Sequence, residues 1–157
     1  MVDRKENYHA IMASPCGMLG IVADNAVRCI DFLGPRVAVR SPTTLLARAT
    51  VRQLIAYFRD ATWRFDLPLV LMGTTHQQRV WHVLQTIPVG EVLCYSDVAH
   101  RLHSGARAVG GACGANPVPI IVPCHRVVAR NGLGGFTGGR VAKATDIKQW
   151  LLQHEGA

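Results

Sequence analysis

The sequence predicts an α+β protein in two parts, a small N-terminal domain of β-sheet plus helix and a mostly helical C-terminal domain with a helix-turn-helix. Three observations support this fold class. Residues 10–33 read as β structure around a turn, and residues 51–58 have apolar side chains at helical spacing. Beyond Gly73 the apolar spacing is helical. We place the boundary between residues 69 and 70, so the domains span 1–69 and 70–157.

The N-terminal domain is expected to contain a turn at Asp24-Asn25, with strand residues 21–23 before it and 28–32 after it. A helix then begins near Thr43 or Thr44. Its buried face has the spacing i, i+3, i+4 and i+7 and consists of Val51, Leu54, Ile55 and Phe58. A last strand is predicted where apolar residues alternate with Arg64, Asp66 and Pro68, namely at Trp63, Phe65, Leu67 and Leu69.

The C-terminal domain is expected to start with a capping box, in which Thr75 is the N-cap of a helix and Gln78 reaches back from the third helical position. The buried stripe of that helix is Val80, Leu84 and Ile87. Two short helices follow, at 96–102 and 106–115, and the turn at Gly105 joins them as a helix-turn-helix. Asn116-Pro117 ends the second one, because a residue before proline is pushed out of the α region.

The composition excludes several classes of protein. With 49% hydrophobic and 17% charged residues, the chain is not disordered, collagen-like or a coiled coil. Its apolar stretches are short and broken by proline, so no membrane span is expected. The charged residues 1–6 are followed by no signal core, which favours a cytoplasmic protein. The five cysteines are odd in number and form no CxxC pair, which predicts reduced thiols.

The charge distribution and one unusual helix point towards a polyanion. The formal net charge is +7, and residues 101–157 supply +5 of it, from seven Lys/Arg against Asp146 and Glu155. The helix at 106–115 contains three glycines, each costing about 1 kcal/mol relative to alanine. They allow either tight helix packing or close approach of the backbone to a nucleic-acid groove, with Arg107 projecting beside it. The two readings stay open.

Cys124 lies between a proline and His125 at the end of an apolar run. A cysteine becomes a useful nucleophile only beside a base or a positive charge, and His125 and Arg126 are the local candidates. Neighbours in an extended segment point to opposite sides, so His125 would reach the thiol through a water molecule. The alternative is a buried core cysteine without chemistry.

The wider pattern around Cys124 resembles one family. Pro123-Cys-His-Arg-Val127, preceded by Asn116-Pro-Val-Pro-Ile120 and Arg107-Ala-Val-Gly-Gly111, closely resembles the O6-alkylguanine-DNA alkyltransferases. Residues 87–95 are similar to the segment leading into that family's helix-turn-helix, and residues 150–155 to its C-terminal helix. The strong resemblance covers residues 73–157. The order of hairpin, helix and strand in residues 10–70 agrees weakly with the family's N-terminal domain.

The resemblance implies catalytic roles for five residues. Cys124 would accept the alkyl group, and His125 would take the thiol proton through a water. Glu155 would orient and charge-stabilise the imidazole, and Asn116 would link the helix-turn-helix to the active-site turn. Tyr95 would contact the flipped guanine or its phosphate, and its hydroxyl would stabilise the departing guanine by hydrogen bonding. In the predicted C-terminal helix, Glu155 lies at the edge of a buried stripe formed by Ile147, Trp150, Leu151 and His154.

The resemblance also implies DNA contacts and a pocket for the base. Arg107 would enter the duplex in place of the extruded nucleotide. The small residues Ala108 and Gly111 would allow close groove contact, and Arg126 is assigned to DNA binding. The pocket residues would be Cys113, Phe136, Thr137 and Lys148.

The chain departs from the family at two places. Phe136 stands where the family commonly has a tyrosine, so it can stack on a base but has no hydroxyl to donate. The segment from Arg140 to Ile147 is longer than the family leads us to expect. Some members hold a zinc ion, but Cys16, Cys29 and His9 lack close ligand spacing, and we expect no metal here.

The expected function is therefore DNA repair by stoichiometric transfer of an alkyl group from O6-alkylguanine, and from O4-alkylthymine, in duplex DNA to Cys124. No cofactor is expected, and the protein is expected to act as a monomer on double-stranded DNA carrying alkylated bases. Two rivals remain. One is a non-catalytic sensor of alkylated bases, which would need a disabled nucleophile. The other is a cysteine hydrolase, which would need an oxyanion hole.

Overall fold

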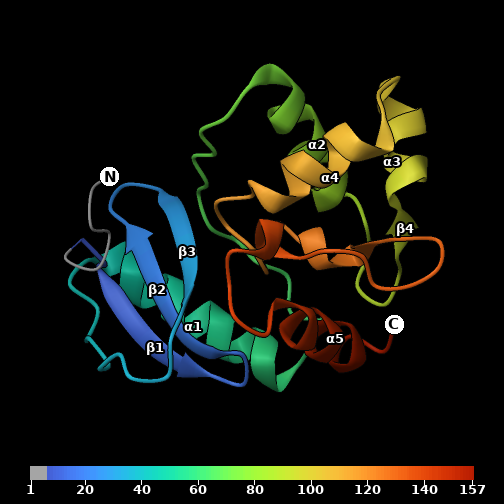
Figure 1. Ribbon diagram of the computed structural model, residues 1–157. Helices are drawn as coiled ribbons and strands as arrows, with labels where there is room; N and C mark the ends of the chain where they lie inside the picture. Colours follow the sequence, from blue (N-terminus) through green and yellow to red (C-terminus); the bar gives the residue numbers. More distant parts are fainter. Residues whose placement is uncertain (1–6) are drawn as a thin grey trace. The chain divides into compact units, whose positions relative to one another are not determined.

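The computed structural model describes residues 7–157, which form two compact units that adjoin in the chain between Leu71 and Met72 (Figure 1). Each unit has its own secondary structure and its own buried residues. Within the described range, no helix is long and apolar enough to cross a bilayer.

The N-terminal unit is a three-stranded antiparallel sheet with one helix packed on it (Figure 1). Strands β1 (Ala10–Ser14), β2 (Gly17–Ala23) and β3 (Val27–Leu33) lie in the order of the chain. Helix α1 (Leu45–Arg59) contacts all three strands. The predicted turn at Asp24-Asn25 is confirmed, because β2 ends at Ala23 and β3 begins at Val27. The predicted start of the helix is confirmed too, because Thr44 Oγ1 accepts the N–H of Ala47 at 2.9 Å.

Two predictions for this unit are wrong. Residues 63–68 form no strand, and only Leu69 forms a bridge, to Val27. Pro68 has no N–H to donate, so a regular ladder of strand hydrogen bonds cannot run through it.

The buried face of α1 is also rotated from the predicted one, with Ile55 38% exposed. The residues buried on α1 are Ala47, Thr50, Leu54 and Tyr57.

The C-terminal unit contains the helix-turn-helix as predicted. Helix α2 (Thr75–Gln85) precedes α3 (Tyr95–Leu102) and α4 (Ala106–Gly114), and the turn between the last two passes through His103 in a left-handed conformation. The predicted stripe of Val80, Leu84 and Ile87 is buried. Trp81 Nε1 donates to the carbonyl of Ala112 at 2.8 Å, which fastens α2 to α4.

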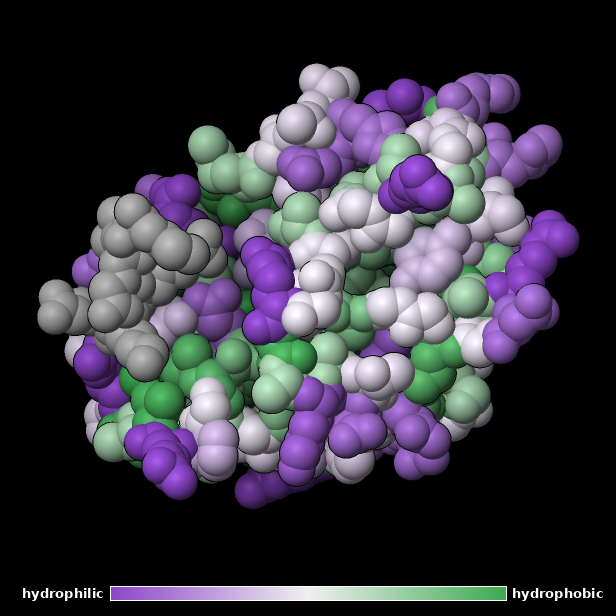
Figure 2. Space-filling view, in the orientation of Figure 1, coloured by the Kyte–Doolittle hydropathy of each residue, from purple (hydrophilic) through white to green (hydrophobic). Residues whose placement is uncertain are grey.

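The rest of this unit surrounds a short segment that begins at Cys124. Strand β4 (Leu93–Cys94) pairs in parallel with β5 (Val127–Val128), which brings the start of α3 beside the 3₁₀ helix η2 (Cys124–Arg126). A second 3₁₀ turn, η3 (Thr137–Gly139), and helix α5 (Ala144–His154) complete the unit. Figure 2 shows hydrophilic side chains gathered over α3, where His100 and Arg101 are exposed.

Two details differ from the sequence prediction. The capping box of α2 uses Thr74 and Gln77, one residue earlier than expected, because the pattern Thr-x-x-Gln occurs in two overlapping registers. The buried face of α5 is not the apolar stripe that we predicted, since Ile147, Trp150 and His154 are only half-buried. The buried positions are Lys148, Leu151, Leu152 and Glu155. Lys148 and Glu155 are charged and still face inward, because each forms hydrogen bonds with buried polar groups.

Candidate active site

The chain reaches Cys124 through a tight turn built around Asn116. The Asn116 Nδ2 donates to the carbonyl of Val122 at 2.7 Å, and its Oδ1 accepts the N–H of Val118 at 3.0 Å. Between these two contacts Ile120 has a φ of 74°, a left-handed conformation that β-branched residues rarely adopt. Such a conformation persists only where its surroundings hold it. Asn116 therefore links the end of α4 to the segment before Cys124.

Cys124 is the first residue of η2 and is only 4% exposed. Burial raises the pKa of its thiol above the usual 9.0, whereas a hydrogen bond from Asn116 and the positive charge of Lys148 act in the opposite direction. The thiol is therefore protonated at neutral pH. It needs a base before it can act as a nucleophile.

His125 is fully buried and is held by a carboxylate. Its Nε2 lies 2.8 Å from Oε1 of Glu155, and a carboxylate only accepts, so the ring carries its hydrogen on Nε2. The other nitrogen, Nδ1, is buried and has no hydrogen-bond partner among the described residues. Burial lowers the pKa of His125 below 6.5, although the Glu155 contact opposes this. At neutral pH the ring is thus neutral, with Nδ1 able to accept a proton.

Glu155 is held in turn by Arg126. Arg126 donates from Nε to Oε2 and from Nη2 to Oε1 of Glu155, both at 2.9 Å, and from Nη1 to the carbonyl of Ile87 at 2.6 Å. Burial alone would raise the pKa of Glu155, but the hydrogen bonds from His125 and Arg126 lower it to about 2. The Arg126 side chain is only 13% exposed. This corrects our expectation that Arg126 faces DNA, because its donors are directed inward to Glu155 and Ile87.

The Glu155→Gln substitution is expected to lower the free energy of unfolding by about 3 kcal/mol at pH 7, because it leaves Arg126 without its buried counter-charge. The wild-type protein should also lose roughly 3 kcal/mol as the pH falls from 4.5 to about 2. The sign follows from the lowered pKa, since the stabilisation is present above the usual value and is lost as the carboxylate becomes protonated. Urea unfolding at pH 7, 5, 3 and 2 measures both effects.

The matched control is Glu91→Gln, which neutralises an exposed carboxylate of the same unit. We expect Glu91→Gln to retain the wild-type dependence on pH, and Glu155→Gln to be much flatter below pH 4.5. Equal losses in the two variants would contradict a special role for the buried contact.

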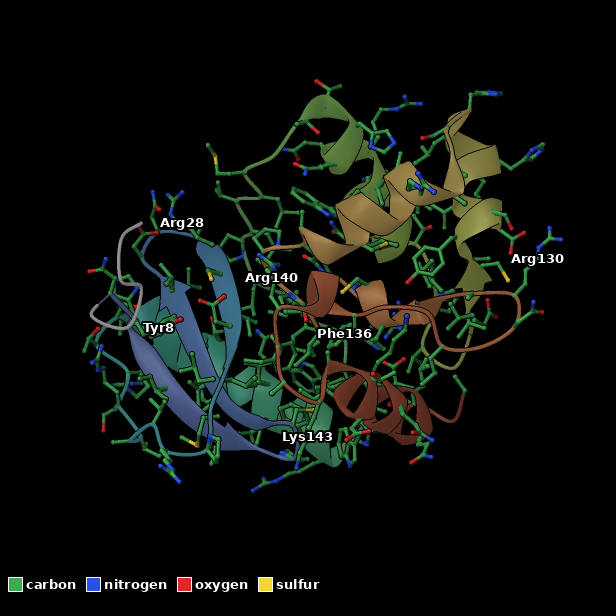
Figure 3. The ribbon with its side chains drawn as sticks, viewed as in Figure 1. Tyr8, Arg28, Arg130, Phe136, Arg140 and Lys143 are labelled. Atoms are coloured by element: carbon green, nitrogen blue, oxygen red, sulfur yellow. The ribbon has the colours of Figure 1, made fainter. Side chains whose placement is uncertain are left out.

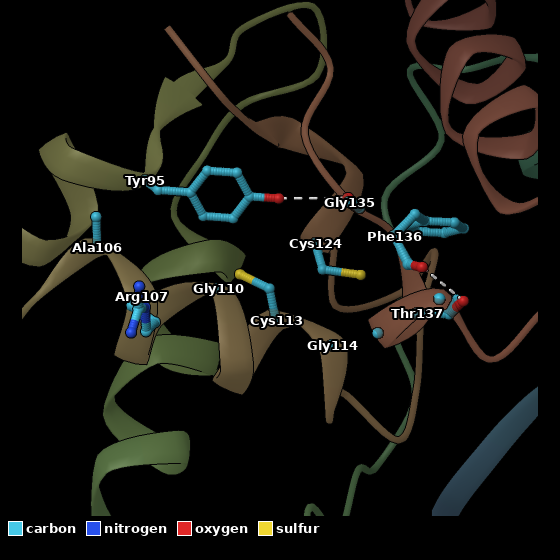
Figure 4. A pocket seen from close by; sticks show the side chains of 12 residues that line it. Tyr95, Ala106, Arg107, Gly110, Cys113, Gly114, Cys124, Gly135, Phe136 and Thr137 are labelled. Carbon is cyan, nitrogen blue, oxygen red and sulfur yellow. Dashed lines mark hydrogen bonds between the residues drawn. The ribbon is translucent and has the colours of Figure 1, made fainter.

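Cys124 opens into a cavity of about 440 Å³. Helix α4 forms one wall of the cavity and residues 135–139 form another (Figure 4). The Cys124 sulfur is directed towards the side where Phe136 and Thr137 lie (Figure 4). The lining residues are Tyr95, Ala106, Arg107, Gly110, Cys113, Gly114, Cys124, Gly135, Phe136, Thr137, Gly138 and Gly139.

Comparison with known proteins assigns this chain to a family. Residues 75–157 match the family model of the 6-O-methylguanine DNA methyltransferase, DNA binding domain. A methylated-DNA–protein-cysteine methyltransferase from Methanosarcina acetivorans is 36% identical over 96% of this chain and 99% of its own length. The chain belongs to the methylated-DNA–protein-cysteine methyltransferase family.

Solved structures of the methyltransferase family agree with this assignment. The crystal structure of the Mycobacterium tuberculosis O6-methylguanine methyltransferase superposes with a TM-score of 0.80 and 36% identity, covering 94% of this chain and 92% of that one. Another, of Mycobacterium tuberculosis OGT in complex with DNA, has a TM-score of 0.78 and 37% identity, covering 93% and 91%. The protein is thus a DNA repair methyltransferase that acts on alkylated DNA through a cysteine, and the expected α+β fold class is confirmed.

Lys148 of this methyltransferase lies behind the pocket wall instead of lining the pocket. Its Nζ donates to the carbonyls of Val127 at 2.6 Å and Gly135 at 2.8 Å, and to the hydroxyl of Tyr95 at 3.4 Å. Burial lowers the pKa of Lys148 to about 8, although the negative charge of Cys124 in its thiolate form would oppose this. Burial also raises the pKa of Tyr95 to about 12. Lys148 thus supports the loop that carries Gly135, and Tyr95 remains protonated.

The structure brings together most of the residues that the sequence singled out. Cys113, Phe136, Thr137 and Tyr95 line one pocket with Cys124, and Arg107 lies at the exposed side of α4. Asn116 and His125 adjoin Cys124, and Glu155 contacts His125. Ala108 and Gly111 are exposed on α4 and do not line the pocket.

The sequence left two interpretations open for the glycines of α4, tight helix packing and close approach to a nucleic-acid groove, and the structure supports each at a different glycine. A Cβ at Gly114 would lie 3.0 Å from the backbone of Gly138, so this position serves packing. A Cβ at Gly111 would meet nothing within 4 Å, so its face of the helix is open. Sequence reasoning missed Gly114, Gly135 and Arg140 as parts of the site. The run of glycines at 134–139 and the unusually long segment after Gly139 were the available signals.

Proposed function

We propose that Cys124 is the acceptor in a direct, stoichiometric transfer of an alkyl group from O6-alkylguanine, and from O4-alkylthymine, in duplex DNA. One observation carries this proposal. Cys124 opens into the pocket, while the adjacent His125 is held by Glu155 with its Nδ1 buried and without a partner among the described residues. A buried thiol of raised pKa is thereby given a neutral base that a single water can connect to it.

The transfer balances without a cofactor. His125 takes the thiol proton through a water, and Glu155 stabilises the resulting imidazolium. The thiolate forms a bond to the alkyl carbon as the bond from that carbon to O6 breaks, and the electron pair stays on guanine. The Tyr95 hydroxyl lines the pocket and can donate to the departing base. The thioether left on Cys124 has no easy leaving group, so each molecule reacts once.

The surface around the pocket supports duplex DNA as the partner. A relative was crystallised in complex with DNA. Arg107, Ala108 and Gly111 are exposed on α4, the second helix of the helix-turn-helix. A stacked guanine does not present its O6 substituent to a buried thiol, so the base must be flipped out at a cost of a few kcal/mol. Arg107 at the pocket can fill the vacated space and meet phosphate charge.

A cysteine hydrolase accounts for less of the structure than alkyl transfer does. That activity needs backbone N–H groups beside the nucleophile to stabilise an oxyanion. It would also have no use for a helix-turn-helix whose second helix places an arginine, Arg107, at the pocket. A lesion sensor without transfer would have no use for the arrangement of His125 and Glu155 behind a thiol.

Mass spectrometry after mixing with a duplex containing O6-methylguanine tests the proposal. We expect a stable gain of about 14 Da, one methylene, on Cys124 at a ratio of one per protein molecule. Peptide mapping assigns the site. A protein that binds the lesion without any adduct would be a sensor, and an adduct on another residue would overturn the assignment of Cys124.

A further inference from the structure

A single side chain, Arg140, fastens one wall of the pocket to another. Its Nε donates to the carbonyl of Thr137 at 2.9 Å, and its Nη2 donates to the carbonyl of Gly114 at 2.6 Å. Thr137 begins the turn η3, and Gly114 is the last residue of α4. Arg140 and Phe136 come from the same loop (Figure 3). The guanidinium therefore bridges two segments that both line the pocket.

The turn that Arg140 holds has an unfavourable backbone. Thr137, Gly138 and Gly139 have φ values of 54°, 65° and 73°, and a β-branched residue such as Thr137 rarely adopts this conformation. The turn also approaches α4 closely, since a Cβ at Gly114 would lie 3.0 Å from the Gly138 backbone. A turn of this kind keeps its position only where its surroundings hold it. The two hydrogen bonds of Arg140 serve that purpose.

We propose that Arg140 is a positioning residue that sets the width of the pocket at the alkyl group, and so the size of the alkyl group that the protein accepts. This inference rests on the proposed role of Cys124. The alkyl carbon must touch the Cys124 sulfur, which is directed towards Phe136 and Thr137 (Figure 4). The alkyl group is therefore enclosed between Cys124 and the turn that Arg140 holds. A larger group needs that turn to move outward.

The chemistry of arginine suits this role better than that of a general cation. A guanidinium presents donors in fixed directions and can reach two carbonyls at once, whereas an ammonium is a point charge on a flexible stem. Arg140 is also exposed, so a contact with a DNA phosphate is the competing explanation. The two explanations differ for Arg140→Lys, which keeps the charge and loses the bridge.

The test compares Arg140→Lys and Arg140→Met with the control Lys143→Met. Lys143 is an exposed cation in the same connection to α5, and its side chain has no hydrogen bond or ion pair with another described residue (Figure 3). Single-turnover rates are measured on duplexes of one sequence carrying O6-methylguanine or O6-benzylguanine. A loss of folded protein lowers both rates by the same factor, so the ratio of the rates reports the pocket alone.

We expect both Arg140 variants to raise the ratio of benzyl to methyl rates about fivefold, well below the hundredfold effect that a shift of an ångström can have. Lys143→Met should keep the wild-type ratio. An unchanged ratio in both Arg140 variants overturns the inference. Normal behaviour of Arg140→Lys, with Arg140→Met slow only on duplexes and not with free O6-benzylguanine, also overturns it and assigns Arg140 to a phosphate. Absence of an adduct on Cys124 in the wild-type protein would instead refute the proposed function.

Discussion

Replacement of Cys124 with alanine is expected to abolish alkyl transfer while the affinity for lesion-containing duplex DNA stays within a few-fold of the wild-type value. The substitution removes only a sulfur atom from a pocket whose walls are formed by α4 and residues 135–139. The helix-turn-helix surface is unchanged by it. Cys124→Ser should fail equally, because a hydroxyl is a far weaker nucleophile than a thiolate. Intact-mass measurement with an O6-methylguanine duplex and a gel-shift titration give the two quantities.

Cys16→Ala is the matched control for this experiment. Cys16 is a half-buried thiol in the other unit, in the turn between β1 and β2, and it should be dispensable for transfer. Cys113 also lines the pocket, but burial raises its pKa to about 12, so its thiol is protonated at neutral pH. An adduct on Cys113 or Cys94 in the Cys124→Ala variant would contradict the assignment.

Replacement of Arg107 with alanine is expected to slow repair of duplex DNA about ten- to hundredfold, and to leave the reaction with free O6-benzylguanine nearly unchanged. In a duplex the damaged base must first leave the stack, and an inserted arginine offsets part of that cost. A loss of 1.4–2.8 kcal/mol of this support corresponds to the stated range of rates. A free base has nothing to unstack, so Cys124, His125 and the pocket alone set its rate. Single-turnover kinetics with both substrates measure the difference.

Two further variants interpret the result for Arg107. Arg107→Lys should restore the duplex rate only in part, because it keeps the charge and loses the planar group that can stack. Arg101→Ala removes another exposed arginine of the helix-turn-helix that does not line the pocket, and at saturating DNA it should react at the wild-type rate. Equal losses on both substrates in Arg107→Ala would mean that Arg107 supports the fold or the thiol. No loss on either would place the inserted residue elsewhere.

The local sequence was sufficient to predict the helix-turn-helix and the segment that carries Cys124. Gly105 between two short apolar periods and the stop at Asn116-Pro117 delimit α3 and α4 within a residue or two. Helix-boundary patterns of this kind involve residues a few positions apart, so they can be recognised without knowing the tertiary structure. The capping box of α2 shows their limit. Thr74 and Thr75 each have a glutamine three residues later, and only the hydrogen bonds decide between them.

The buried charges show what the sequence could not decide. From hydrophobic spacing we predicted Glu155 at the edge of the buried stripe of α5 and did not include Lys148 in that stripe. In the structure both side chains are buried. A buried charge is tolerated only where partners meet it. For Glu155 those partners are His125 and Arg126, which lie 30 and 29 residues away in the chain.

The sequence by itself therefore determined the helix-turn-helix and the segment that carries Cys124. The tertiary structure alone decided that Arg126 faces Glu155 instead of DNA, that Lys148 supports the pocket from behind, and that Arg140 bridges two of its walls. The physical reason is the range of the interactions. Helix caps and apolar periods are complete within one or two turns, whereas the partner of a long charged side chain depends on which distant segments the fold brings beside it.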